Sequence, residues 1–249
     1  INMPMLDTAE TVANRYSISR EVQDEYSVIS QARTAAAQEA GLYADEIVPV
    51  TATKLVTNRE TGEVTEEVVT LAKDEGNRPG TNLEGLSGLK VVRSGGTITG
   101  GNASQLSDGA AAVVIKSASQ AKSDGDSPLA RIVSWGIVGL DPAIMAYGPV
   151  PSSRLALEKA GLSVDDIDRW EINEAFAGQA VACVNDLGLD IDKVNVNGGA
   201  VGLGHPLAAT GTRLVLTLAH ELKRCGGKYG VATACIGGGQ GIAMVIESI

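Results

Sequence analysis

Segments typical of β-strands alternate with segments typical of α-helices along the second half of this chain. The strand-like runs are short and apolar, and the stretches between them repeat apolar residues at helical spacing. Parallel strands need a crossover long enough for a helix, so the alternation predicts βαβ units, an α/β fold and a mostly parallel sheet. The last two strands are close enough to form an antiparallel hairpin. The predicted strands are residues 129–138, 169–172, 194–197, 229–235 and 241–247, and the predicted helices are residues 152–160, 174–187 and 208–225.

The first half of the chain is predicted to contain two helices, two strands and a long loop. Helices over residues 7–16 and 19–40 are followed by strands over residues 46–50 and 64–72. Residues 73–107 are rich in Gly, Asn, Ser and Pro, and loops of this length in compact proteins often contact ligands. The small or apolar residues that would form one buried face of the second helix are Val22, Tyr26, Ile29, Ala32, Ala36 and Ala40.

Two short segments resemble each other. Ala-Val-Val-Ile-Lys-Ser at residues 112–117 is similar to Ala-Met-Val-Ile-Glu-Ser at residues 243–248, and each is predicted to hold the last strand of one half, the first over residues 112–115. A polar linker over residues 117–127 separates the halves. The chain begins at Ile1 without an initiator Met or a signal peptide, so we expect it to be the downstream part of a longer chain whose first half has lost its beginning.

Composition limits the classes of function. With 249 residues, of which 44% are hydrophobic, the chain can build a substantial core. The net charge of −10 argues against general binding to nucleic acid, and no apolar run approaches the roughly 20 residues needed to span a bilayer, so we expect no membrane association. Three widely spaced cysteines, without a Cys-x-x-Cys pair or a histidine at metal-ligand spacing, indicate a reduced, cytoplasmic protein without a metal site.

Three predicted strands end in segments with chemically useful residues. Asn173 follows one strand, His205 lies in the glycine-rich turn after the next, and Cys235 ends a third. In open α/β sheets ligands bind outside the carboxyl ends of the strands, so we expect these residues at one edge. An imidazole and a thiol serve acid–base or nucleophilic catalysis on acyl groups, and the glycine run that begins at Gly237 leaves backbone N–H groups free to bind an oxyanion.

Each candidate also has a purely structural interpretation. His205 would cap the helix that follows it, Asn173 would be an ordinary N-cap, and Cys235 would be a small buried apolar residue. A dinucleotide-binding loop is disfavoured, because Leu207 stands where the third small residue should be. We expect Cys235 to react with alkylating agents before the other two thiols. Structural roles are assigned to Cys183, Cys225 and His220.

Several sequence blocks occur in the order found in one known family. They are Gly-Asn-Ala-Ser at residues 101–104, Asp-Gly-Ala-Ala at 108–111, Gly-Pro-Val-Pro at 148–151, Asn-Glu-Ala-Phe at 173–176, Asn-Gly-Gly-Ala at 197–200 followed by Gly-His-Pro at 204–206, and Cys-Ile-Gly-Gly-Gly-Gln-Gly at 235–241. Together they resemble the signatures of the thiolase family, the acetyl-CoA C-acyltransferases, over essentially the whole chain.

The resemblance implies a duplicated fold of αβαβα layers, with a loop domain inserted in the first half and assembly as homodimers or tetramers. Residues 1–106 would correspond to a loop domain for CoA binding and oligomerisation, incomplete at its start. Residues 107–127 would be the end of the N-terminal half, and residues 128–249 the C-terminal half. This division agrees with the two similar segments described above.

The resemblance also implies a chemistry. The family's acyl-accepting nucleophile is a cysteine of the N-terminal half, and no position here matches its motif, so the nucleophile would come from a missing N-terminal portion in the same or another chain. His205 would activate that thiol and hold the thioester oxygen, helped by Asn173 through a water. Cys235 would exchange a proton with the substrate α-carbon or with CoA, its thiolate favoured by a neighbouring dipole, and Gly237 would donate its N–H to the enolate or acyl oxygen.

CoA thioesters would be the substrates, and no cofactor would be bound permanently. The resemblance assigns a phosphate contact to Arg78 and a pantetheine contact to Ser104, with Ala175 and Phe176 lining the channel. The segment after Arg78 departs from the family, since it is shortened and glycine-rich and lacks an aromatic residue. Asn2 stands where some members carry a histidine, and both departures leave the preferred acyl chain length open.

Three hypotheses about function follow. The first is a thiolase portion for CoA-dependent cleavage of 3-ketoacyl-CoA, or the reverse Claisen condensation, inactive as an isolated fragment. The second is a non-catalytic binding or scaffold subunit with the thiolase fold, which would have no need of His205, Asn173 and Cys235 together. The third is a ketoacyl synthase relative, which normally uses two histidines in place of the His and Cys pair. The sequence leaves the direction of the reaction open.

Overall fold

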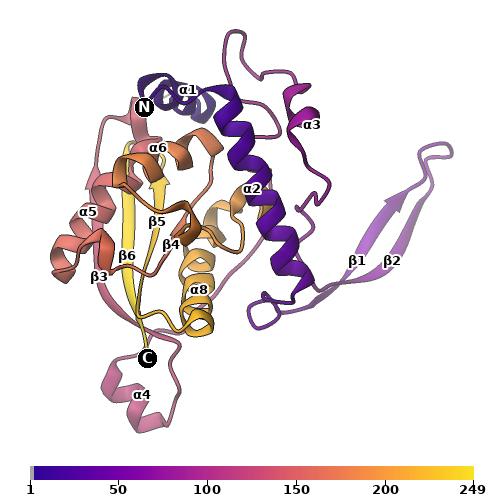
Figure 1. The fold of residues 1–249 in the computed structure, drawn as a ribbon. Coiled ribbons are helices and arrows are strands. Elements are labelled where there is room, and N and C mark those ends of the chain that lie inside the picture. The colour runs from indigo at the N-terminus through magenta and orange to yellow at the C-terminus, as the bar shows by residue number, and fades with distance from the viewer. Residues whose placement is uncertain (1–2) are drawn as a thin grey trace.

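The computed structural model describes residues 3–249 and has a four-stranded sheet at its centre (Figure 1). The strands β3 (Ala130–Gly139), β4 (Arg169–Ile172), β5 (Tyr229–Ile236) and β6 (Gln240–Ser248) lie in the order β3-β6-β5-β4. Strands β4 and β5 are parallel, whereas β6 is antiparallel to both of its neighbours. The α/β fold and the hairpin at the end of the chain are confirmed, but the prediction of a mostly parallel sheet is wrong.

Residues 194–197 do not form the predicted strand. Val194 makes a single parallel bridge to Trp170, and the chain then turns at Asn195, whose φ is 45°. The side chain of Asn195 bonds to both backbone groups of Ile172, accepting from its N–H at 2.8 Å and donating to its carbonyl at 2.9 Å. A side chain therefore takes the place of further backbone pairing, and the glycine-rich loop starts directly after the bridge.

Helices cover both faces of the sheet (Figure 1). Helices α5 (Pro149–Ala160) and α6 (Ala177–Leu187) pack on one face, and α8 (Leu207–Cys225) packs on the other. Because successive strand residues point to opposite faces, the neighbours Val245 and Ile246 join different cores, the first with α5 and α6 and the second with α8.

Helices α1 (Met5–Arg15) and α2 (Arg20–Glu39) match the two helices predicted at the start of the chain, but α2 buries a different face. Val22 and Ile29 are each 39% exposed. The backbone of the glycine-rich segments beside α2 needs hydrogen-bond partners, and polar side chains supply them, so burial here follows hydrogen bonding rather than hydropathy. The buried residues of α2 are Gln23, Asp24, Tyr26, Ser27, Ser30, Gln31, Thr34 and Ala37.

An antiparallel hairpin of β1 (Val50–Thr57) and β2 (Val64–Leu71) extends away from the body of the molecule (Figure 1). The strand predicted over residues 64–72 is confirmed. The strand predicted over residues 46–50 is wrong, because β1 begins only at its last residue. Thr217 of α8 donates a hydrogen bond to the Glu46 carboxylate at 2.6 Å and so holds the segment before β1 against the body.

Residues 112–115 do not form the predicted strand either. Residues 104–117 have no regular secondary structure, and Val114 and Ile115 are 86% and 71% exposed. The similar segment at residues 243–248 lies in β6, which is paired on both sides. A strand needs partners for its backbone groups, and within residues 3–249 no strand pairs with this segment.

The remaining elements are short. None of the helices within residues 3–249 is long and apolar enough to cross a membrane. The short elements are α3 (Leu83–Ser87), α4 (Ala118–Asp124) and α7 (Ala200–Leu203), and the 3₁₀ helices η1 (Pro142–Tyr147), η2 (Val164–Asp166) and η3 (Ile191–Lys193).

Candidate active site

Two of the predicted site residues lie at neighbouring strand ends. In the parallel pair of β4 and β5, Ile172 is in register with Thr233, and the N–H of Asn173 donates to the carbonyl of Thr233 at 2.9 Å. Cys235 lies two residues further along β5. The strand register therefore brings Asn173 and Cys235 to one edge of the sheet.

His205 joins this edge through a hydrogen bond. Its Nε2 lies 3.2 Å from the Asn173 amide nitrogen, and its Nδ1 lies 2.7 Å from the Thr210 hydroxyl. The Thr210 hydroxyl donates to the Pro206 carbonyl at 3.0 Å, so its oxygen accepts a hydrogen bond from Nδ1–H. The ring then carries its proton on Nδ1, and Nε2 keeps a lone pair that accepts from Asn173. This tautomer places the basic nitrogen toward the site.

The surroundings of His205 keep it neutral. Partial burial, and then the nearby positive charge of Arg213, lower the pKa of His205 below its ordinary value. Arg213 lies on α8 and donates to the buried carboxylate of Glu171 on β4 at 2.9 Å. Burial raises the pKa of Glu171 to about 8, although the positive charge of Arg213 opposes this shift.

The structural interpretations of His205 and Asn173 are wrong. The N-cap of α8 is Pro206, without a side-chain hydrogen bond, and the imidazole bonds to two side chains instead. Helix α6 has Phe176 as its N-cap and begins at Ala177, three residues later than the predicted helix over residues 174–187, so Asn173 caps no helix. The Oδ1 atom of Asn173 is buried and has no hydrogen-bond partner within residues 3–249, which leaves it available to a water or a ligand.

Cys235 is a thiol rather than a thiolate in this chain. Its side chain is half-buried among apolar residues of α1 and α6, and this burial raises the pKa of the thiol to about 11. A backbone hydrogen bond lowers the pKa, in the direction expected of a neighbouring dipole, but burial outweighs it within residues 3–249. At neutral pH Cys235 can donate a proton, and it becomes a base only after that proton has left.

Cys225 should be alkylated before Cys235 and Cys183, which reverses the order expected from the sequence. Cys225 is exposed at the end of α8, Cys183 is buried, and the raised pKa of Cys235 leaves little thiolate near neutral pH. Iodoacetamide labelling followed by peptide mass mapping at pH 7 and pH 9 measures this order. In a Cys225→Ser variant the fast label should disappear, and the rate at Cys235 should rise with pH. Fast labelling of Cys235 at pH 7 would contradict its protonated state.

The turn between β5 and β6 presents Gly237 to solvent. Gly237 is exposed, and a Cβ atom placed on it would meet no atom within 4 Å. Gly239 is buried at a φ of 92°, and a Cβ there would lie 2.4 Å from the Leu140 carbonyl oxygen. The close approach at Gly239 fixes the turn, while the space around Gly237 remains open to a ligand.

The predicted pantetheine contact and channel residues lie side by side. Ala103 forms an antiparallel bridge with Phe176, and the N–H of Ser104 donates to the Ala175 carbonyl at 3.0 Å. Ala175 and Phe176 are buried, whereas Ser104 is half-buried. Backbone pairing thus joins the segment before Ser104 to the segment that follows Asn173.

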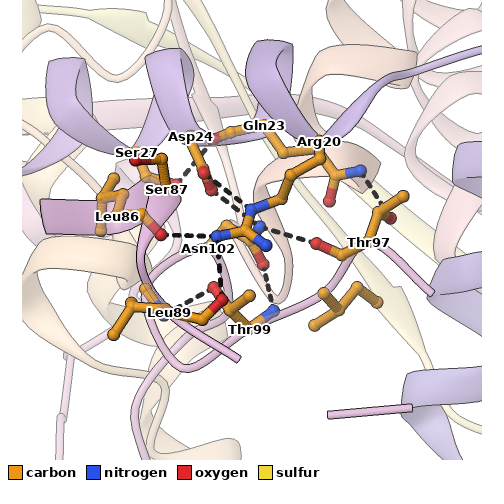
Figure 2. A network of polar contacts seen from close by, with 12 residues as sticks. Arg20, Gln23, Asp24, Ser27, Leu86, Ser87, Leu89, Thr97, Thr99 and Asn102 are labelled. Atoms are coloured by element: carbon orange, nitrogen blue, oxygen red, sulfur yellow. Dashed lines mark hydrogen bonds and ion pairs between the residues drawn. The ribbon is translucent and has the colours of Figure 1, made fainter. Parts of the chain in front are cut away.

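A polar network fixes the loop that leads to Ser104 (Figure 2). The fully buried Asn102 accepts from the N–H of Thr99 at 2.8 Å and donates to the Asp24 carboxylate at 3.0 Å. Asp24 in turn pairs with Arg20 at 2.7 Å on the same helix, α2. Because side chains of α2 hold this loop, the helix supports the predicted CoA-contacting residues.

Arg78 borders a cavity of about 290 Å³ that lies next to this loop. The cavity brings the arginine close to Ala103, the neighbour of Ser104, although the two predicted contacts lie far apart in sequence. The side chain of Arg78 is exposed, while its backbone N–H is bonded to Gln31 at 2.8 Å. The lining residues are Gln31, Arg78, Thr81, Leu86, Leu89, Gly100, Gly101, Ala103, Gln105 and Val201.

Asn2 lies outside the described residues, so its predicted role in chain-length preference has no structural counterpart here. Residues that the sequence interpretation missed are Thr210, which orients His205, and the buried residues Gln31 and Glu174, which bond to the carbonyl and the N–H of Val201. Thr210 lies one helical turn after the His-Pro pair in the sequence, and this spacing could have indicated a contact with His205. Within residues 3–249, no group of three or more His, Cys, Asp or Glu side chains is placed to hold a metal ion.

Comparison with known proteins identifies the family. Residues 2–119 match the thiolase N-terminal domain, and residues 126–248 match the thiolase C-terminal domain. The chain therefore belongs to the thiolase family. It is 49% identical over 249 residues to human mitochondrial 3-ketoacyl-CoA thiolase and 50% identical over 248 residues to the 3-oxoadipyl-CoA/3-oxo-5,6-dehydrosuberyl-CoA thiolase of Escherichia coli K12. These matches cover 100% and 98% of the chain and 60% of each relative.

Solved structures support the same assignment. The crystal structure of human mitochondrial 3-ketoacyl-CoA thiolase superposes with a TM-score of 0.90 at 49% identity, covering 99% of this chain and 60% of that one. The Bacillus anthracis acetyl-CoA acetyltransferase also gives a TM-score of 0.90, at 46% identity, with the same coverage. The thiolase-like fold predicted from the resemblance is confirmed. The chain spans about 60% of the length of the relatives it matches.

Proposed function

We propose that this chain supplies the acid–base and CoA-binding part of a thiolase active site. The reaction is CoA-dependent cleavage of a 3-ketoacyl-CoA or the reverse Claisen condensation, with CoA thioesters as substrates and no permanently bound cofactor. An N-terminal thiolase portion, in the same or another chain, supplies the nucleophilic cysteine. The observation that carries this proposal is the neutral His205, oriented by Asn173 and Thr210 at the same sheet edge as Cys235.

The proposed cleavage assigns a role to each residue. The lone pair on His205 Nε2 takes the proton of the nucleophilic thiol, and the thiolate then attacks the 3-keto carbon. As the bond between C2 and C3 breaks, its electron pair leaves on acetyl-CoA as an enolate, whose oxygen accepts the N–H of Gly237. Cys235 protonates the enolate at C2, and its protonated state at neutral pH suits that step. The resulting Cys235 thiolate then removes the proton of the incoming CoA thiol, which attacks the acyl-enzyme. The acyl group passes to CoA, and the departing thiolate of the nucleophilic cysteine takes back its proton from His205.

The raised pKa of Cys235 does not favour either direction of the overall reaction. In the condensation direction the same group must remove a proton from the α-carbon, so each direction uses both protonation states of Cys235 in turn. We propose that the N-terminal portion completes this environment. Because a scaffold would need neither an oriented base nor a thiol beside it, the catalytic hypothesis is preferred over the non-catalytic one.

CoA would lie between the cavity at Arg78 and the catalytic edge. We propose that Arg78 contacts the phosphates, that Ser104 contacts the pantetheine arm, and that Ala175 and Phe176 line the channel. The proximity of Arg78 and Ala103 around one cavity supports this arrangement, as does the backbone pairing of Ser104 with Ala175.

The Arg78→Ala variant should raise the KM for CoA thioesters more than it lowers kcat. Phosphates remote from the reacting carbon contribute mainly uniform binding, which is lost equally from the ground state and the transition state. The effect should shrink at high salt because the contact is screened. Steady-state kinetics with CoA thioesters and with pantetheine thioesters lacking the nucleotide measure the difference. An equal loss with the pantetheine substrates would assign Arg78 another role.

An N-terminal portion would also cover apolar surface that is exposed in this chain. Trp135 and Ile137 on β3 are 54% and 56% exposed, and the segment at residues 112–117, which pairs with no strand within residues 3–249, exposes Val114 and Ile115. Surfaces of this kind mark interfaces. Because this segment resembles β6, which lies between two strands of a sheet, we propose that strands of the N-terminal portion pair with it.

We also propose that residues 1–106 form the loop domain, residues 107–127 the end of the N-terminal half and residues 128–249 the C-terminal half.

We further propose that copies of the protein associate as a homodimer or tetramer through the hairpin of β1 and β2. An isolated two-stranded hairpin is marginally stable in water, so a partner is expected to cover it. Its apolar side chains are exposed, among them Leu55 at 65% and Val68 at 74%.

A cytoplasmic location is proposed from the three free cysteines.

The test of the proposed function is reconstitution. The chain is produced together with a thiolase N-terminal portion, and cleavage of acetoacetyl-CoA and of longer 3-ketoacyl-CoA substrates by CoA is measured. We expect cleavage that requires both parts and His205. A correctly folded complex that binds CoA without cleaving any 3-ketoacyl-CoA would favour the scaffold hypothesis.

A further inference from the structure

Gln31 connects the wall of the cavity at Arg78 with the loop that carries His205. It is buried on α2, and its Oε1 atom accepts from the N–H of Arg78 at 2.8 Å and from the Asn77 amide at 3.0 Å. Its Nε2 atom donates to the Val201 carbonyl at 2.9 Å. One side chain therefore bonds to both segments, which are far apart in the sequence.

Val201 lies in α7, directly before the residues that lead to His205. While Gln31 binds its carbonyl, its N–H donates to the Glu174 carboxylate at 3.0 Å, so both backbone groups of Val201 are held. Gln105, another residue of the cavity wall, also donates to the Val201 carbonyl, at 3.3 Å. Val201, which itself lines the cavity, is thus bonded through its carbonyl to two other residues of the cavity wall and through its N–H to Glu174, the neighbour of Asn173.

Glu174 restrains the Val201 peptide within a larger hydrogen-bond network. Its carboxylate is fully buried and accepts four hydrogen bonds, from Tyr26 at 2.9 Å, Ser30 at 2.7 Å, Asn195 at 2.8 Å and the Val201 N–H at 3.0 Å. A buried donor that loses its partner keeps the full desolvation cost of its polar group, so the network moves as a unit rather than bond by bond. Because Glu174 follows Asn173 in the chain, movement of the network reaches the residue that bonds to His205.

We infer that Gln31 is a positioning residue, through which a ligand in the cavity at Arg78 adjusts the position of His205. The inference rests on the proposed CoA site and goes beyond it. When the phosphates of a ligand bind Arg78 and move its segment, the hydrogen bond from the Arg78 N–H to Gln31 either breaks or moves the Gln31 side chain. We infer the second case, in which the movement of Gln31 displaces Val201, and with it α7 and His205. The nucleotide end of CoA would then help to set the geometry of the base, not only hold the substrate.

The experiment uses a ligand that cannot touch His205 itself. Adenosine 3′,5′-bisphosphate carries phosphates and an adenosine, but no pantetheine arm. The 249-residue chain contains two histidines, His205 and His220, so a sample labelled with ¹⁵N-histidine gives few imidazole signals. The chain is measured in complex with an unlabelled N-terminal portion. Saturating probe should shift the His205 signals and leave those of His220 in place.

The decisive variant is Gln31→Met, which keeps the side-chain length but removes both hydrogen-bonding groups. We expect the probe Kd to change by less than about tenfold, which corresponds to 1.4 kcal/mol, while the shift of His205 is lost. Gln38→Met is the matched control, since Gln38 lies on the same helix and bonds to the Asp74 carbonyl instead. It should behave as the unchanged protein does. If Gln31→Met fails to fold, Gln31→Asn shortens the side chain by one methylene and gives the same test.

The possible outcomes separate the inference from the proposed function. Probe binding without any shift of His205 in the unchanged protein would overturn the inference and leave the proposed catalysis untouched. The same holds if Gln31→Met retains the shift, or if it loses binding while remaining folded, because Gln31 would then belong to the ligand site. Absence of probe binding to the unchanged protein would overturn the nucleotide site at Arg78 and the inference with it.

Discussion

The His205→Ala variant of the reconstituted enzyme should lose about 10² to 10⁴ in kcat, the usual size of a general acid–base contribution. The variant removes the lone pair at Nε2 and leaves Asn173 and Thr210 without their shared partner. Because His205 is only half-buried, we expect the variant to remain folded, so the loss in kcat should not result from unfolding. Steady-state cleavage of acetoacetyl-CoA measures the effect.

The matched control is His220→Ala on the same helix that follows His205. Within residues 3–249, the charged groups near His220 are Asp45, Arg224 and Lys223, none of which is a predicted site residue, so its removal should change kcat little. The pH profile gives a second check. The active form of His205 is neutral and its pKa is lowered from the ordinary value of 6.5, so activity should be lost only as the pH falls through a value below 6.5. Equal losses for the two histidine variants would remove the basis for the assignment.

The 249-residue chain alone should show no thiolytic turnover, and addition of an N-terminal thiolase portion should restore it. The reason is chemical, because no cysteine here suits the role of nucleophile. Cys183 is fully buried, with its pKa raised by burial, and the pKa of Cys235 is raised to about 11. Cys225 is exposed at a helix end, away from the edge that holds His205.

This second prediction is measured as acetoacetyl-CoA cleavage by each part and by the mixture. CoA binding to the chain alone, followed by calorimetry, shows whether the absence of turnover reflects a missing nucleophile or an unformed site. Cleavage by the chain alone that disappears in a Cys235→Ser variant would make Cys235 the nucleophile and would contradict the proposed division of roles.

The placement of candidate site residues could be predicted from the sequence wherever local rules sufficed. Asn173 and Cys235 could be placed at one edge because the ends of parallel strands coincide, and β4 and β5 are the pair for which that rule applies. The antiparallel pairing of β6 with β5 was predicted, but the position of β6 between β5 and β3 could not be, since a strand that follows a short turn can pair on either side of its predecessor. The strand predicted over residues 112–115 is wrong for a different reason, because its apolar pattern is typical of a strand but no strand within residues 3–249 pairs with it.

The buried face of α2 marks the limit of reasoning from hydropathy. Val22 and Ile29 have the spacing of a core stripe, yet Gln31 and Ser30 are buried instead. Their burial depends on what lies opposite, namely backbone groups of α7 and the Glu174 carboxylate, and these come from segments more than a hundred residues away. Such pairings cannot be read from the periodicity of one helix. The role of Thr210 cannot be read from periodicity either, because it depends on the orientation of the His205 imidazole, whose Nδ1 bonds to the Thr210 hydroxyl.

The carboxylate of Glu174 is held by neutral donors alone, and this constrains how the chain can change over evolutionary time. Removing Tyr26, Ser30 or Asn195 leaves a buried negative charge short of a partner, and replacing Glu174 leaves several donors facing one another. No single substitution among the four is neutral by itself. These positions should therefore covary, or stay fixed together, in related chains, even though only Glu174 belongs to a recognisable sequence block.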